Sequence, residues 1–97
     1  MSAENSLSLA EEISIMNVAE WQSTLLEVLE NSTVINLDAA ELCRIDTAGM
    51  QLLTAFVMQA QSAGIDFKWQ NPSQILIGTA KQLGLEQALL LEAGEWE

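Results

Sequence analysis

The fold is decided by Thr33-Val34-Ile35-Asn36-Leu37, a run in which three of the five residues are β-branched. Such runs favour extended backbone, and a mostly apolar one fits a strand that is covered by helices. The run follows a helical pattern at short distance, as the interior strand of a β-α-β unit does. We therefore expect it near the centre of a sheet.

The segment before this run has the periodicity of an amphipathic helix. Asn17 is the expected cap of its first turn, with Glu20 three residues later completing a capping box. Asn31 and Ser32 end it. Its apolar residues share one face, with glutamates toward solvent: Val18, Trp21, Leu25, Val28 and Leu29.

A longer helix is expected after a mixed loop over residues 38–45. Asp46 and Thr47 are both candidate caps, and Gly64 ends the helix because glycine adopts the left-handed conformation easily. Residues 65–70 then alternate apolar and polar side chains, which predicts a further strand. The apolar positions of this helix include Leu52, Leu53, Phe56, Val57 and Ala60.

The two ends of the chain hold shorter elements. Residues 6–15 alternate in two pieces, which predicts a pair of half-buried strands near one sheet edge. Asn71-Pro72 is expected to cap and begin a third helix, which Gly84 ends. Residues 85–91 predict a last apolar turn or helix, before an acidic end around Trp96.

The order strand, strand, helix, strand, helix, strand, helix predicts a single α/β domain over residues 1–97. Such an order gives a mostly parallel sheet with helices packed against it. The chain has no linker, repeat or low-complexity tract at which a second domain would begin.

The charge balance restricts the partners. Fourteen acidic and three basic residues give a formal charge of -11. Nucleic acids and anionic membranes would repel this chain, since binding to both relies on clustered Lys and Arg. A basic protein surface is the natural counterpart, although the charge also serves solubility. Without a spanning segment or signal peptide, we expect a cytoplasmic protein.

Catalysis and metal binding are not expected. The chain has no histidine, and its single cysteine, Cys43, is predicted to be a small buried side chain. Glu11, Glu12 and Glu41 are acid-base candidates by residue type only, and such groups are usually solvated. No Walker-type phosphate loop is present. We expect neither an enzyme nor a bound cofactor or metal.

The segment Arg44-Ile45-Asp46-Thr47-Ala48-Gly49-Met50 carries the functional signal. It places the Thr47 hydroxyl at the start of the long helix, where free amides and the helix dipole favour a phosphate. The plainer alternative is a cap by Asp46 or Thr47. Ala48 and Gly49 let a partner, or the sheet, approach closely. Met50 belongs either to a docking patch or, the favoured alternative, to the core, and Met58 is similarly ambiguous.

The sequence resembles STAS domains, the family of anti-sigma factor antagonists. The resemblance is carried by residues 34–38 and 45–53, with further likeness over residues 12–20 and 81–85. It implies an α/β STAS fold, a mixed and mostly parallel sheet of about four to five strands with helices packed against one face.

The resemblance also implies a function. In such proteins the Ser or Thr after the aspartate is phosphorylated by a partner that is both kinase and anti-sigma factor, and phosphorylation releases that partner. By this resemblance Thr47 is the phosphoacceptor. A serine is commoner at this position in the family. Ser14 stands where many phosphorylated members have an aspartate. The partner-binding residues implied are Asp46, Thr47, Ala48, Gly49 and Met50.

Two other binding functions remain open at this stage. Single-domain STAS proteins similar to this chain bind the ATPase of a lipid-trafficking transporter, where Thr47 would be a contact in a permanent interface. An adaptor in a chemotaxis or signalling cluster differs from the switch mainly in its target. Self-association is left open as a weak homodimer. Trp21 and Trp69 are expected in the core, and Trp96 is unassigned.

Overall fold

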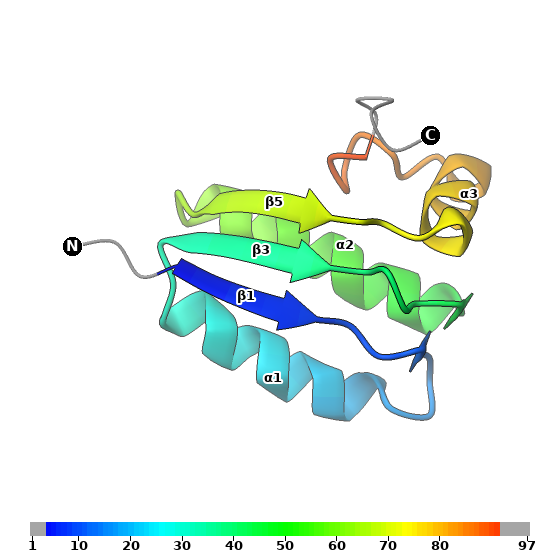
Figure 1. Ribbon diagram of the computed structural model, residues 1–97, viewed down its shortest axis with the longest axis horizontal. Coiled ribbons are helices and arrows are strands. Elements are labelled where there is room, and N and C mark those ends of the chain that lie inside the picture. The colour runs from blue at the N-terminus through cyan, green and yellow to red at the C-terminus, as the bar shows by residue number, and fades with distance from the viewer. Residues whose placement is uncertain (1–3, 92–97) are drawn as a thin grey trace.

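The computed structural model describes residues 4–91 (Figure 1). The expected acidic end around Trp96 lies outside the described residues. The elements are β1 (Glu4–Ser8), β2 (Glu12–Ile13), α1 (Val18–Glu30), β3 (Val34–Asp38), β4 (Arg44–Ile45), α2 (Thr47–Ser62), β5 (Asp66–Gln70) and α3 (Gln74–Leu83).

The main sheet has three parallel strands in the order β1-β3-β5. The apolar run that begins at Thr33 supplies its central strand, as predicted. Ile35 and Leu37 alternate toward the helices and are fully buried, which is the packing that the β-branched pattern favours. The α/β class, the parallel pairing and the expectation of a STAS fold are confirmed.

The predicted strand count is wrong. We expected four to five strands in one sheet, but β2 and β4 form a separate two-stranded parallel sheet. β1 and β2 do not pair with each other, because each pairs with a strand from beyond α1. The backbone amides of Cys43 and Arg44 both donate to the carbonyl of Glu11, which joins these segments beyond the main sheet.

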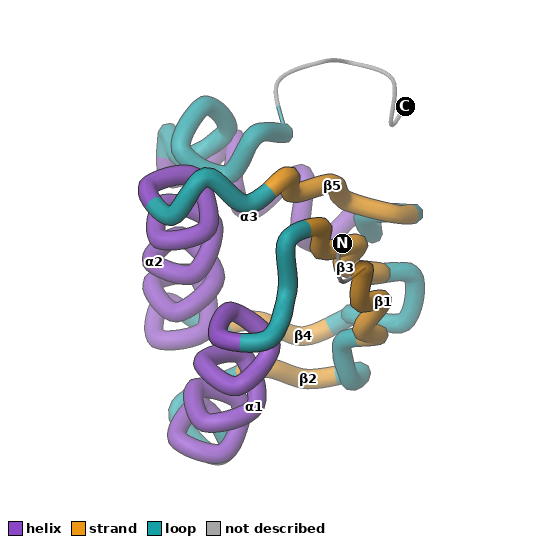
Figure 2. Tube along the Cα trace, turned by 90° about the vertical axis from the view of Figure 1, so that its left-hand side faces the viewer, coloured by secondary structure: helices purple, strands orange, loops and turns teal. Residues whose placement is uncertain are grey.

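The helices α1 and α2 cover one face of the sheet, as predicted (Figure 2). The other face carries polar side chains such as Asn36, whose amide nitrogen donates to the carboxylate of Glu4 at 2.7 Å. β2 and β4 lie beyond the carboxyl ends of β1 and β3 (Figure 1). This end of the molecule is where α1 and α2 begin.

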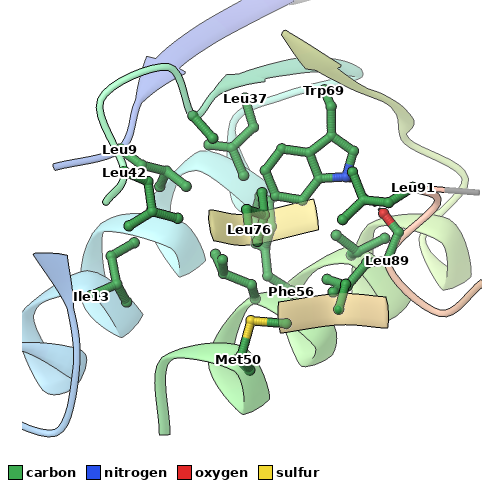
Figure 3. Close-up of a cluster of buried hydrophobic side chains, with 14 of the residues drawn as sticks. Leu9, Ile13, Leu37, Leu42, Met50, Phe56, Trp69, Leu76, Leu89 and Leu91 are labelled. Atoms are coloured by element: carbon green, nitrogen blue, oxygen red, sulfur yellow. Dashed lines mark hydrogen bonds between the residues drawn. The ribbon is translucent and has the colours of Figure 1, made fainter. Parts of the chain in front are cut away.

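Trp69 links the sheet to the C-terminal turn. Its indole is buried against Leu37 and Leu91 in the core, and its Nε1 donates to the carbonyl oxygen of Leu89 at 2.7 Å (Figure 3). A buried indole N–H needs such a partner. The predicted core position of Trp69 is confirmed, and Trp21 packs against the same core while half-buried.

The glycine stops were predicted correctly, but the start of α3 was not. Gly64 and Gly84 have φ of 76° and 71°, the left-handed conformation that closes a helix. Asn71 also has a positive φ, of 49°, so the chain turns there and cannot yet be helical. Pro72 is buried in the connecting loop, and Ser73 caps α3 by accepting from the amide of Leu76.

Cys43 is exposed, contrary to the prediction of a buried side chain. The neighbouring Leu42 takes the core position in this loop. A single cysteine beside a leucine gives no periodic pattern, so the sequence could not decide which of the two faces inward. No helix within residues 4–91 has the length and apolar character needed to cross a bilayer.

Candidate protein-docking site

The start of α2 is capped by Asp46. Its backbone is extended, and its Oδ1 accepts a hydrogen bond of 2.8 Å from the amide of Gly49. Thr47 is the first residue of the helix and its side chain is exposed. Of the two caps that the sequence left open, Asp46 is therefore the one used, and the hydroxyl of Thr47 remains on the surface.

The same carboxylate holds a second segment. Asp46 Oδ2 accepts a hydrogen bond of 2.9 Å from the amide of Ile15, in the loop between β2 and α1. These backbone amides, first that of Ile15 and then that of Gly49, lower the pKa of Asp46 below its ordinary value of 3.8. One ionised side chain thus joins the two loops that follow β2 and β4.

The loop over residues 14–17 is also bonded within itself. Asn17 turns back, accepting from the amide of Ser14 at 2.9 Å and donating to the carbonyl of Glu12 at 2.8 Å. Its side chain makes no cap to α1, so the predicted capping box with Glu20 is wrong. Ser14 Oγ donates to the Glu12 carboxylate at 2.7 Å and accepts from the amide of Met16.

Gly49 brings α2 into direct contact with β2. A Cβ atom built on Gly49 would lie 2.2 Å from the carbonyl oxygen of Ile13 and 2.8 Å from Cγ1 of Ile45. No side chain fits in this space, so the small residue serves the close approach of the helix to β2. Gly49 is buried and Ala48 is half-buried.

The loop that is hydrogen-bonded to Asp46, next to Thr47 in the chain, presents two apolar side chains to solvent. Ile15 is 70% exposed and Met16 is 84% exposed. We call the surface formed by Ile15, Met16, Asp46, Thr47 and Ala48 the rim. Two neighbouring apolar side chains this exposed, on a loop fixed by hydrogen bonds, are typical of a contact surface for another protein.

Sequence reasoning missed the apolar half of the rim. Ile15 was expected to alternate with Ile13 in a half-buried strand, but the strand ends at Ile13, which is fully buried. The available signal was Ser14 and Asn17 three positions apart, residues that form turns through their side chains. That spacing indicates a turn whose two central residues point outward.

Met50 lies in the core with its side chain fully buried (Figure 3). Core packing, the favoured alternative for Met50, is therefore correct. The side chain of Met50 is not available to a partner protein. Gly49 contributes through its backbone fit rather than through exposed atoms. Met58 is exposed, on a different part of α2.

The rim is poorly suited to catalysis. Both oxygens of Asp46 accept from backbone amides and its pKa is lowered, so it is a weak base toward the neighbouring hydroxyl of Thr47. The ion pair between Arg44 and Glu12 is 3.7 Å long and solvated, so it contributes little. Residues 4–91 contain no cluster of three or more metal-ligating side chains. Glu11 and Glu41 are exposed.

Comparison with known families identifies the class of this domain. The family model described as "Mlab, STAS domain" matches residues 2–92, so the chain belongs to the STAS domain family. Members of this family are generally non-catalytic and mediate binding between proteins. Comparison with curated proteins gives no match.

A solved structure has a similar fold. It is the crystal structure of a sulfate transporter family protein from Wolinella succinogenes, with a TM-score of 0.72 and 23% sequence identity. The match covers 89% of this chain and 70% of the other. At this identity the likeness concerns the fold.

The fit at Gly49 predicts opposite effects for two glycine substitutions. Gly49→Ala should lower the free energy of unfolding by roughly 1–3 kcal/mol, because the added methyl group overlaps the Ile13 carbonyl. Gly78→Ala in α3, where no atom lies within 4 Å of the new Cβ, should raise it by about 0.5–1 kcal/mol. Urea unfolding measures both. Equal changes in the free energy of unfolding for the two variants would show that α2 is not closely packed against β2 at Gly49.

The lowered pKa of Asp46 predicts a pH-dependent contribution to stability. A depressed folded-state pKa stabilises above the ordinary value of 3.8 and ceases to do so as pH falls through the folded-state pKa. Asp46→Asn keeps an oxygen for the cap but presents an amide group to Ile15. The variant should be less stable than the wild type at pH 7, with the difference shrinking below pH 3.8.

The control is Glu41→Gln, which removes one negative charge from an exposed side chain. Urea unfolding at pH 7 and below pH 3.8 should show no comparable change for it. A stability difference between wild type and Asp46→Asn that is independent of pH would contradict the role of the ionised carboxylate.

Proposed function

We propose that this domain is a non-enzymatic docking module that binds a protein partner through the rim. The single observation that supports this most is the exposure of Ile15 and Met16 on a loop that is hydrogen-bonded to Asp46, the residue before Thr47. An apolar contact with a polar group at its edge is the usual anatomy of a protein interface. The charge of -11 favours a partner whose surface around the contact is basic.

We further propose that negative charge at Thr47 prevents docking. A phosphate adds about -1.5 to -2 charge next to the carboxylate of Asp46. The amide of Gly49, one of the donors at the helix start, is already bonded to Asp46. The phosphate would therefore face outward, where it repels an acidic neighbour and must lose water before any partner can approach.

In the partner switch, a cognate Ser/Thr kinase that is also an anti-sigma factor binds the unmodified domain. The kinase then phosphorylates Thr47 and dissociates from the phosphorylated domain. A binding loss of about 1.4 kcal/mol is already tenfold in affinity, so one phosphate in a desolvated contact is sufficient. The exposed position of Thr47 supports its access to a kinase.

A second candidate is a permanent subunit that binds the ATPase of a lipid-trafficking transporter. The description "Mlab, STAS domain" of the matching family model favours it, and the solved structure similar in fold is titled a sulfate transporter family protein. Thr47 would then be a constant contact. An adaptor in a signalling cluster would use the same rim with another target. We place all these partners in the cytoplasm, where ATP is available.

Substitutions at Thr47 test the proposal. Thr47→Glu should weaken binding to the cognate partner by about tenfold or more, because the new carboxylate stands in the contact. Thr24→Glu makes the same change at an exposed threonine on α1, away from the rim, and should leave affinity nearly unchanged. Calorimetry with a purified candidate kinase or transporter ATPase measures each affinity.

Thr47→Ala separates the two candidates. The switch predicts that alanine binds as well as threonine and that the kinase modifies Thr47 in the wild type, which mass spectrometry detects. The permanent interface predicts that alanine and glutamate both weaken binding to the ATPase, with no phosphate. Equal affinities for Thr47→Glu and Thr24→Glu would exclude docking at the rim in either form.

A further inference from the structure

A groove runs between α1 and α2 on the side away from the sheet. It is a depression open to solvent, and its apolar lining comes from Leu25, Leu26, Leu29, Leu52, Ala55 and Phe56. A second, more open hollow shares Leu26 and Leu29 and continues along both helices to Glu30 and Ala63. The two helices lie side by side along it (Figure 2).

The groove is separate from the rim. The rim surrounds Thr47 at the start of α2, whereas the groove begins at Leu52 and widens toward the end of the helix. Leu26 stands at the edge of the groove with 44% of its surface exposed. The site therefore adds a second surface to the one used in the proposed function.

The helix α2 supplies an independent observation. None of its 16 residues is charged, although 18% of the whole chain is, so a segment of this length would on average carry about three charges. Its solvent side carries only uncharged residues: Gln51, Ala55, Met58, Gln59, Gln61 and Ser62. Depletion of charge at the centre of a surface marks an interface.

The opposite wall is acidic. Glu30 is exposed on α1 and borders the wider part of the groove. Neither α1 nor α2 contains Lys or Arg. A ligand in this groove therefore meets an apolar floor, a neutral wall on α2 and a negative wall on α1.

We propose that this groove binds an amphipathic helix of a partner protein. The helix would place a stripe of leucine-like side chains, spaced i, i+3 or i+4 and i+7, on the apolar floor. Lysine or arginine along one side of that stripe would face Glu30 and the acidic surface of a chain whose charge is -11. A second copy of this chain is disfavoured as occupant, because it has the same charge of -11 and the only basic residue in its helices α1 to α3 is Lys81.

The experiment uses the full chain and a fluorescein-labelled helical peptide with a leucine stripe flanked by lysines. A matched peptide has glutamate at every lysine position. We expect the lysine peptide to bind and the glutamate peptide not to bind. In NMR titration, the amides that shift should be those of the second half of α1 and of residues 52–63.

Two matched variants test the location. Leu26→Lys should weaken peptide binding at least fivefold, because it places a like charge on the apolar edge. Ile75→Lys, on α3 with 42% exposure against 44%, changes the net charge equally and should alter affinity less than twofold. If Leu26→Lys does not fold, Ala55→Lys introduces the same charge from the α2 side of the groove and should weaken peptide binding in the same way.

Each remaining outcome counts against the proposal. Equal losses for the Leu26 and Ile75 variants would mean that only the overall charge attracts the peptide. Shifts confined to the rim or to the open face of the sheet would place the ligand elsewhere. A concentration-dependent dimer in sedimentation that Leu26→Lys abolishes would make a second copy the occupant.

Discussion

The carboxylate of Asp46 is the point on which the functional end of this domain depends. One oxygen caps α2 through Gly49 and the other holds the amide of Ile15. Charge-assisted hydrogen bonds to backbone amides are stronger than neutral ones, and both act here on segments that belong to different β-α connections. Gly49 makes the arrangement compatible with packing, since any side chain there would push α2 away from β2.

The consequence is a surface with two distinct parts. The rim combines exposed apolar side chains with the hydroxyl of Thr47, and in the proposed switch the carboxylate of Asp46 adds to the repulsion that a phosphate on Thr47 would cause. The groove between α1 and α2 lies farther along the same helices and is lined by leucines. We propose that this small STAS domain of charge -11 uses the rim as a charge-sensitive contact and the groove as a separate apolar one, both for basic partners.

Local patterns predicted the main elements of the fold. The β-branched run after Thr33, the apolar face of α1 and the stops at Gly64 and Gly84 each depend on neighbours in the chain, so the sequence alone reveals them. The separate β2-β4 sheet, the inward turn of Asn17 and the exposure of Cys43 depend on contacts between distant segments. Asp46 and Thr47 were found by motif, but Ile15 and Met16 joined them only through a hydrogen bond across 31 positions.

The most direct test of this account is hydrogen exchange at the amide of Ile15, compared between wild type and Asp46→Asn. Asparagine can still cap α2 but has no second acceptor for Ile15. We predict that the Ile15 amide is protected in the wild type and exchanges at least severalfold faster in the variant. The amide of Leu37, in the central strand, should exchange faster in the variant only by the factor that the loss of overall stability explains, and by less than the amide of Ile15. Unchanged protection at Ile15 would show that the loop is held by something other than Asp46 and would contradict the account.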